Sequence, residues 1–154
     1  TGGKRRGAME EVMKLFKAKN VRYLLIGGQA MRLSGMPRFS MDWDIYIPPA
    51  DKENLAKING LLADEIDVPV EALGPRGENF IQTYQTKWGI IQFHLGGPGL
   101  PPFEKAEKRG IERIDTNGAR IRCMSEKDLL VSKEATGREQ DRIDVEFLRR
   151  KISR

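Results

Sequence analysis

The sequence contains one cysteine, one histidine and no long apolar run, and each of these shortages excludes a class of protein. Cys123 alone cannot form an internal disulfide, and together with His94 it cannot complete a zinc site of the usual Cys/His kind. No apolar stretch approaches the roughly 20 residues that a membrane span needs, and the N-terminus lacks the apolar core of a secretory signal. We therefore expect a cytoplasmic protein that does not enter a membrane.

The 154 residues suit one domain, which we place over residues 8–154. Residues 1–7 are set aside as a loose tail or an expression remnant. Lysine and arginine number 27 against 22 aspartates and glutamates, so the formal net charge is +5. This excess suits a polyanionic ligand such as a nucleotide or RNA, but it is equally typical of a well-solvated basic surface.

Hydrophobic periodicity predicts an α/β (α+β) fold, with a mixed β-sheet, flanking helices and a C-terminal helical pair. Helices are expected over residues 8–19, 29–33, 50–66, from Ser125 onward, and 139–151. Strands are expected over residues 21–26, 41–47, 80–86 and 88–95, with a hairpin formed by 110–116 and 119–124 around Asn117-Gly118. The Gly- and Pro-rich residues 96–102 are expected to form a loop.

Two aspartates alternate with apolar residues on the strand over residues 41–47. Asp42 and Asp44 fall on one face, and Trp43 and Ile45 fall on the other. Their backbones are about 7 Å apart by strand rise, so both carboxylates can bind one metal centre, and a cation would relieve their repulsion. The alternative interpretation is an edge strand with a solvated polar face.

The glycine pair Gly27-Gly28 lies between the first strand and the short helix. A helix that starts directly after two glycines exposes unpaired backbone N–H groups, and the missing side chains let a phosphate approach them. The turn lacks the Lys-Ser/Thr of a P-loop and the third glycine of a dinucleotide fold. The alternative is that the glycines only make a sharp turn.

Together these elements resemble the signature of polymerase-β-type nucleotidyltransferases, especially the branch containing abortive-infection (AbiEii-like) toxins. The resemblance is carried by Gly27-Gly28-x-Ala30-x-x-Leu33-x-Gly35-x-x-Arg38-x-Ser40-x-Asp42-x-Asp44. It is also carried by Ser125-Glu126-x-Asp128-Leu129-Leu130-x-x-Lys133-x-Ala135-x-x-Arg138-x-x-Asp141-x-x-Asp144. It extends over residues 21–148 and is weakest between residues 54 and 79.

The resemblance implies a role for several residues. Gly27 and Gly28 would contact the triphosphate, and Asp42 and Asp44 would be catalytic ligands of Mg²⁺ or Mn²⁺. Lys133 would neutralise phosphate charge or assist the acceptor.

Three further nucleotide-binding candidates come from the same resemblance. Arg38 and Ser40 would brace the strand or touch phosphate, and Arg138 would join Lys133 at the nucleotide. The alternative for the two C-terminal cations is structural. A helix that ends near Gly137 favours cations in its last turn, and Asp141 and Asp144 would then pair with neighbouring arginines.

The sequence departs from the resembled pattern at the third carboxylate, where active members carry an Asp or Glu on a neighbouring strand. This strand instead has Gln92 followed by His94 on the same face. A neutral amide is a poor base and a poor magnesium ligand, whereas His94 could serve as a base or as a ligand of a softer metal. Gln92 and His94 are therefore further candidate metal ligands, and the alternative for His94 is a hydrogen-bonded structural residue.

Three functions stay open on this basis. The first is an enzyme that transfers a nucleoside monophosphate from a metal-bound NTP to a hydroxyl on RNA, a protein or a small molecule. The second is a degenerate member that binds nucleotide or RNA without transfer. The third is an interaction module, such as one half of a toxin–antitoxin pair.

Overall fold

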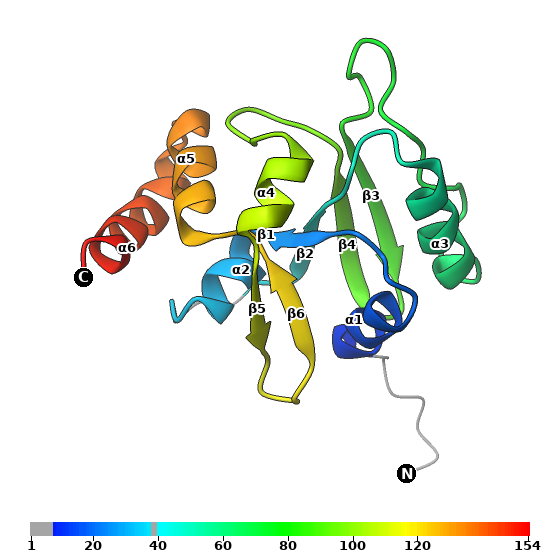
Figure 1. Ribbon diagram of the computed structural model, residues 1–154, viewed down its shortest axis with the longest axis horizontal. Coiled ribbons are helices and arrows are strands. Elements are labelled where there is room, and N and C mark those ends of the chain that lie inside the picture. The colour runs from blue at the N-terminus through cyan, green and yellow to red at the C-terminus, as the bar shows by residue number, and fades with distance from the viewer. Residues whose placement is uncertain (1–7, 38–39) are drawn as a thin grey trace.

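The computed structural model describes residues 8–37 and 40–154. Its centre is a six-stranded mixed sheet with strand order β3-β4-β2-β1-β6-β5, flanked by helices (Figure 1). This confirms the predicted fold class. None of the helices in the described ranges combines the length and apolarity that a transmembrane segment needs.

The helices and strands follow the predicted order with one addition. The strands are β1 (Leu24–Ile26), β2 (Asp42–Tyr46), β3 (Ile81–Thr86), β4 (Gly89–His94), β5 (Ile111–Ile114) and β6 (Arg120–Cys123). The helices are α1 (Met9–Ala18), α2 (Gly27–Leu33), α3 (Lys52–Leu62), α4 (Phe103–Arg109), α5 (Glu126–Thr136) and α6 (Arg142–Ile152), with a 3₁₀ turn at Glu139–Asp141.

The short strand β1 lies at the centre of the sheet. It pairs antiparallel with β2 and parallel with β6, and β2 in turn pairs parallel with β4. Two antiparallel hairpins, β3–β4 and β5–β6, complete the two ends of the sheet. The central strands are therefore held on both sides, which is the environment that a precisely positioned site requires.

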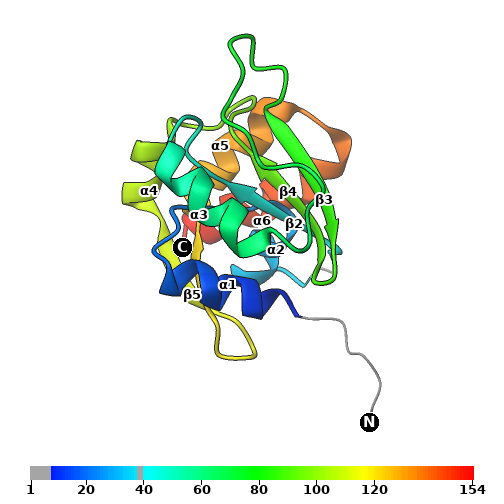
Figure 2. The same cartoon turned by 90° about the vertical axis from the view of Figure 1, so that its right-hand side faces the viewer.

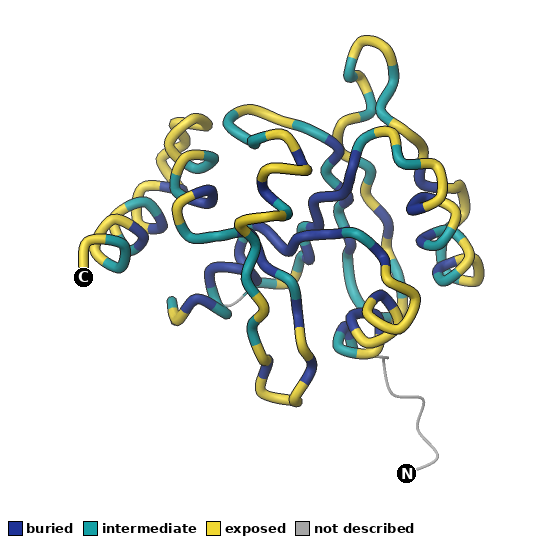
Figure 3. Tube along the Cα trace, in the orientation of Figure 1, coloured by how far each residue is buried: buried dark blue, intermediate teal, exposed yellow. Residues whose placement is uncertain are grey.

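One face of the sheet is covered by α1 and α3, which lie next to one another on the same side of it (Figure 2). Phe16 of α1 and Ile58 of α3 are fully buried, as are Ile45, Ile91 and Phe93 on the strands. Alternation along β2 and β4 sends these apolar side chains to the covered face and the intervening, partly exposed residues, including Asp42, Asp44 and Gln92, to the other. The burial of each described residue along the chain can be followed in Figure 3. Burial on one face thus fixes which way the polar residues point.

Helix α4 was not predicted from the sequence. Within it only Phe103 and Ala106 are buried, so its apolar pattern is too short to stand out. Its ends are nonetheless conventional, because Pro102 precedes the first turn and Gly110 follows the last. The ring of Phe103 meets that of Tyr46 edge-on at 5.2 Å, which holds α4 against the end of β2.

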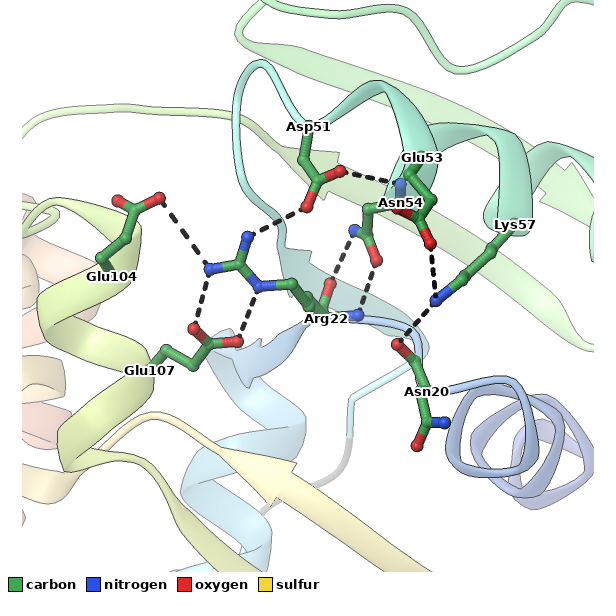
Figure 4. A network of polar contacts seen from close by, with 8 residues as sticks. All are labelled: Asn20, Arg22, Asp51, Glu53, Asn54, Lys57, Glu104 and Glu107. Atoms are coloured by element: carbon green, nitrogen blue, oxygen red, sulfur yellow. Dashed lines mark hydrogen bonds and ion pairs between the residues drawn. The ribbon is translucent and has the colours of Figure 1, made fainter.

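The first strand is shorter than the predicted 21–26, because the backbone of Arg22 is bound by a side chain (Figure 4). The Arg22 amide donates to Asn54 Oδ1 at 2.7 Å, and Asn54 Nδ2 donates to the Arg22 carbonyl at 3.0 Å. The guanidinium of Arg22 then bridges Asp51, 2.9 Å away, and Glu107, 2.8 Å away. This network joins the segment before β1 to the N-terminus of α3 and to the side of α4 (Figure 4).

The C-terminal helical pair is present as predicted. Ser125 accepts a hydrogen bond from the Asp128 amide and caps α5, but the Asp128 carboxylate binds Arg109 instead of returning to the cap. Gly137, with φ of 60°, ends the helix. The predicted helix over residues 139–151 begins as the 3₁₀ turn and continues as α6.

Candidate active site

Asp42 and Asp44 lie on β2 and point to the face opposite the apolar core. Both are partly exposed, whereas Trp43, which lies between them, and Ile45, which follows them, are buried. The predicted alternation is therefore present in the structure. Among the described residues no hydrogen bond or ion pair involves the Asp42 carboxylate, so it is available for a ligand.

The glycine turn lies directly against Asp44. Ile26 is in register with Asp44, and Gly27 follows it with φ of 70°. A Cβ at Gly27 would lie 2.4 Å from Oδ2 of Asp44, well inside contact distance. A side chain is thus excluded at this position both by the backbone angle and by the neighbouring carboxylate.

Helix α2 begins at Gly27 itself, two residues earlier than the sequence indicated. Its cap residue, Ile26, offers no side-chain acceptor, and within residues 8–37 and 40–154 no side chain caps the first amides of the helix. These amides start beside Asp44. The structure therefore brings together the two sequence features, the glycine pair and the aspartate pair, that were proposed to share one site.

Gln92 and His94 lie on the neighbouring strand, β4, on the same face of the sheet as the two aspartates. Gln92 on β4 is in register with Asp44 on β2. His94 Nε2 lies 2.8 Å from Asp44 Oδ1, within hydrogen-bond distance. The sequence places His94 on the same face as Gln92, and its contact with Asp44 arises from the pairing of β2 with β4.

The start of β2 is held by a chain of hydrogen bonds that sequence reasoning missed. Asp115 accepts from Arg32 at 3.0 and 3.1 Å, Arg32 donates to Gln29 Oε1 at 2.8 Å, and Gln29 donates to the Ser40 carbonyl at 2.6 Å. The hydrogen bond from Arg32 holds the pKa of Asp115 below its usual range. The Ser40 hydroxyl donates in turn to the Asp42 carbonyl at 3.3 Å. Ser40 thus braces the strand that carries the aspartates.

Two other candidates from the sequence, Lys133 and Arg138, form ion pairs with acidic residues of the C-terminal segment. A third, Arg38, lies outside the described residues. Lys133 Nζ lies 2.8 Å from Asp144 Oδ2 and 3.4 Å from Asp141 Oδ1, and its side chain is only 11% exposed. Arg138 Nε lies 2.8 Å from Asp141. Although burial acts in the opposite direction, the hydrogen bond from Arg138 helps hold the pKa of Asp141 below its usual range.

A surface hollow of about 320 Å³ lies between α5 and α6, and Lys133 and Arg138 line it together with Arg142 and Arg149. Within the part of the chain that the structure describes, no contact links Lys133 or Arg138 to Asp42 or Asp44. The C-terminal cations therefore form their own cluster, in which acidic partners already occupy them.

The residues present fit a magnesium ion that arrives with a nucleotide better than a metal held by protein alone. In the described ranges no three Cys, His, Asp or Glu side chains gather in a preformed metal cluster. Magnesium is usually held through one or two carboxylates together with substrate phosphates, and Asp42 and Asp44 supply that number of carboxylates. Gln92 adds an amide oxygen on the adjacent strand.

Two solved structures have the same fold. The lincosamide antibiotic adenylyltransferase LnuA, solved with lincomycin bound, matches with a TM-score of 0.62 and 20% identity over 95% of this chain and 98% of that chain. A Thermotoga maritima protein with a provisional nucleotidyltransferase assignment matches with a TM-score of 0.61 and 14% identity over 94% of this chain and 90% of that chain. No protein-family model and no curated protein sequence matches the chain. The chain therefore has a nucleotidyltransferase fold.

Proposed function

We propose that this protein transfers a nucleoside monophosphate from a metal-bound NTP to a hydroxyl acceptor. The observation that carries the proposal is the contact between Gly27 and Asp44, where the start of α2 lies against a metal-binding carboxylate. Free helix amides favour phosphate oxygens, and the carboxylates favour a divalent cation. An NTP with its metal presents both groups side by side.

The roles of the residues follow from this arrangement. The amides of Gly27 and Gly28 bind phosphate oxygens, and Asp42 and Asp44 hold Mg²⁺ or Mn²⁺. When bound, the ion neutralises charge on the phosphate oxygens as the leaving group departs. His94 fixes the orientation of the Asp44 carboxylate through their hydrogen bond.

The transfer itself needs little covalent chemistry from the protein. The acceptor oxygen forms a bond to the α-phosphorus, and the bond between that phosphorus and the bridging oxygen breaks. Pyrophosphate leaves with the bonding electron pair, and the hydroxyl proton passes to water. Gln92, in register with Asp44, is placed to hydrogen bond the acceptor hydroxyl but cannot take its proton.

The structural neighbours support nucleotidyl transfer in general. LnuA is a lincosamide antibiotic adenylyltransferase solved with lincomycin bound, so this fold accommodates a small-molecule acceptor in that protein. RNA and protein acceptors remain candidates through the resemblance to AbiEii-like toxins, as does a partner protein of the toxin–antitoxin kind. Lys133, Arg138 and Arg38 remain candidate phosphate ligands, the first two through the hollow that they line.

One observation favours a second function, a nucleotide-binding protein without transfer. Gln92 stands in register with Asp44, where the resemblance places a third carboxylate. Such a protein would bind the nucleotide and its metal through the same residues but would not activate an acceptor. Transfer activity in a protein with normal nucleotide affinity distinguishes the two functions.

Calorimetry with Mg²⁺ and non-hydrolysable NTP analogues tests the site. Asp42→Asn and Asp44→Asn should each weaken binding by at least about tenfold, because each removes a carboxylate ligand of the cation. Both variants should keep wild-type stability within about 1 kcal/mol, since removing one of two like charges relieves their repulsion. Asp64→Asn, an exposed aspartate beyond α3, is the matched control and should bind as wild type does. Equal affinity in all four proteins would remove the site.

A further inference from the structure

One face of β3 and β4 lies beside the aspartates, and its β3 residues are exposed. It comprises Ile81, Thr83 and Gln85 of β3 together with Ile90, Gln92 and His94 of β4, and we call it the open face. The three β3 residues are exposed, whereas Tyr84 between them is buried on the opposite face. The three β4 residues are partly exposed, and the register joins Thr83 to Gln92 and Gln92 to Asp44 in one row.

The open face is on the opposite side of β2 from the glycine turn. Gly27 contacts Asp44 from the side of β1, and Gln92 adjoins Asp44 from the side of β4. A triphosphate held at the glycines therefore occupies one flank of Asp44 and leaves the other flank for the second substrate. An incoming hydroxyl opposite the leaving group is the geometry that phosphoryl transfer requires.

The chemistry of the open face excludes a polyanion. The strands β2, β3 and β4 contain no lysine or arginine, and the charged residues in them, apart from the histidine, are Asp42 and Asp44. RNA binding depends on cations that neutralise the phosphates. An RNA strand whose hydroxyl reached the α-phosphorus would lie across an uncharged surface bordered by two carboxylates.

One group of cations lies away from the open face. The last turn of α6 carries Arg149, Arg150 and Lys151. In Figure 1 this helix lies at the opposite end of the molecule from β3. These three cations therefore lie away from the place where the acceptor must react.

The open face also has the size and polarity for a small molecule. The two strands of the open face and the adjoining β2 together span about 10 Å across the sheet. The stretch from Ile90 to His94 spans about 13 Å by strand rise. Ile81 is 41% exposed and Ile90 is partly exposed, so the surface offers apolar contacts next to the hydrogen-bonding groups of Thr83, Gln85 and Gln92. Such a mixture is typical of small-ligand sites.

We propose that the open face binds the acceptor, and that the acceptor is a small hydroxyl compound without anionic groups. This inference rests on the proposed nucleotidyl transfer and specifies its second substrate. The acceptor lies over Thr83 and Gln92, with its hydroxyl toward the α-phosphorus held beside Asp44. The strands of the face supply no lysine or arginine that could pair with an anionic group on the acceptor.

The test follows radioactive label from the four α-³²P-NTPs, with Mg²⁺, into three acceptor pools. The pools are total RNA, total protein and a low-molecular-mass filtrate of a bacterial extract. Thr83→Lys places a cation in the centre of the open face. Ile114→Lys places the same cation on β5 at the other edge of the sheet, at a position 62% exposed, and is the matched control. Affinity for a non-hydrolysable NTP analogue is measured for each protein.

We expect label in the low-mass pool, with KM for the purified acceptor raised about tenfold or more by Thr83→Lys, because the new side chain occupies and charges the acceptor surface. Ile114→Lys should leave KM unchanged, and both variants should bind the NTP analogue within about twofold of wild type.

Label in RNA or protein would overturn the inference while leaving the proposed transfer intact. Low-mass label that is indifferent to Thr83→Lys would overturn the placement on the open face. Normal analogue binding with no label in any pool would overturn the inference and favour the binding protein without transfer. Failure of wild type to bind the analogue would instead overturn the proposed function itself, and the inference with it.

Discussion

Gly27→Ala tests the contact on which the site depends, and its effect divides into two parts. The first is backbone strain, since a non-glycine residue at φ of 70° costs about 1–2 kcal/mol. The second is the clash of the new Cβ with Asp44 Oδ2, 2.4 Å away, which forces the carboxylate to move. Overpacking of this kind adds about 1–3 kcal/mol.

Gly77→Ala isolates the first part, because Gly77 has φ of 68° and no atom lies within 4 Å of the Cβ that it would gain. Urea unfolding should therefore show Gly27→Ala to be less stable than Gly77→Ala by about 1–3 kcal/mol. Combining Gly27→Ala with Asp44→Ala should shrink this difference, because the second change removes the carboxylate that is displaced.

Calorimetry gives the functional half of the same prediction. Displacing Asp44 should weaken Mg²⁺–nucleotide binding by at least about tenfold in Gly27→Ala, whereas Gly77→Ala should bind as wild type does. If both alanine variants lose the same stability and bind the nucleotide equally well, then the Gly27–Asp44 contact has no role in the site.

Three further outcomes follow from contacts described above. Gln92→Asp should strengthen Mg²⁺ binding by adding a third carboxylate, and the gain should vanish when Asp44→Asn is added; unchanged calorimetric affinity would contradict this. Arg22→Met should lower the unfolding free energy by about 1–3 kcal/mol in urea, because it leaves two carboxylates unpaired, and no loss would show that the network is dispensable. Asp115→Asn should cost about 1–3 kcal/mol near pH 7, because Arg32 loses its charged partner. The pKa of Asp115 is lower in the folded protein, so its stabilisation is present above the unfolded pKa of about 4 and is lost as pH falls through the folded value. The two unfolding curves should therefore converge at acidic pH, and a constant gap would refute the assignment.

The sequence could predict the fold and the neighbourhood of the site, because both depend on short-range patterns. Alternation over residues 41–47 places Asp42 and Asp44 on one face, as the structure does, and the resemblance assigns Gln92 to a neighbouring strand. The predicted length of the first strand was wrong, because Asn54, on a distant helix, takes the backbone hydrogen bonds of Arg22. Helix α4 was missed because two buried residues are too few to make a period.

The contacts that define the site most closely could not be predicted, because they join residues far apart in the chain. His94 meets Asp44 only because β2 and β4 are neighbours, and strand order is a tertiary property. The chain from Asp115 to Ser40 likewise requires the β5–β6 hairpin to lie near α2. The roles of Lys133 and Arg138 at a nucleotide stay predictions.

The position of β1 has a consequence for how the protein is made. Leu25 pairs with Cys123, about 100 residues later, so one side of the central strand stays unpaired until the C-terminal hairpin has left the ribosome. During that interval the nascent chain exposes a strand edge next to an apolar surface. The edge is only three residues long, which limits what another chain can pair with, so the brevity of β1 protects the protein during synthesis.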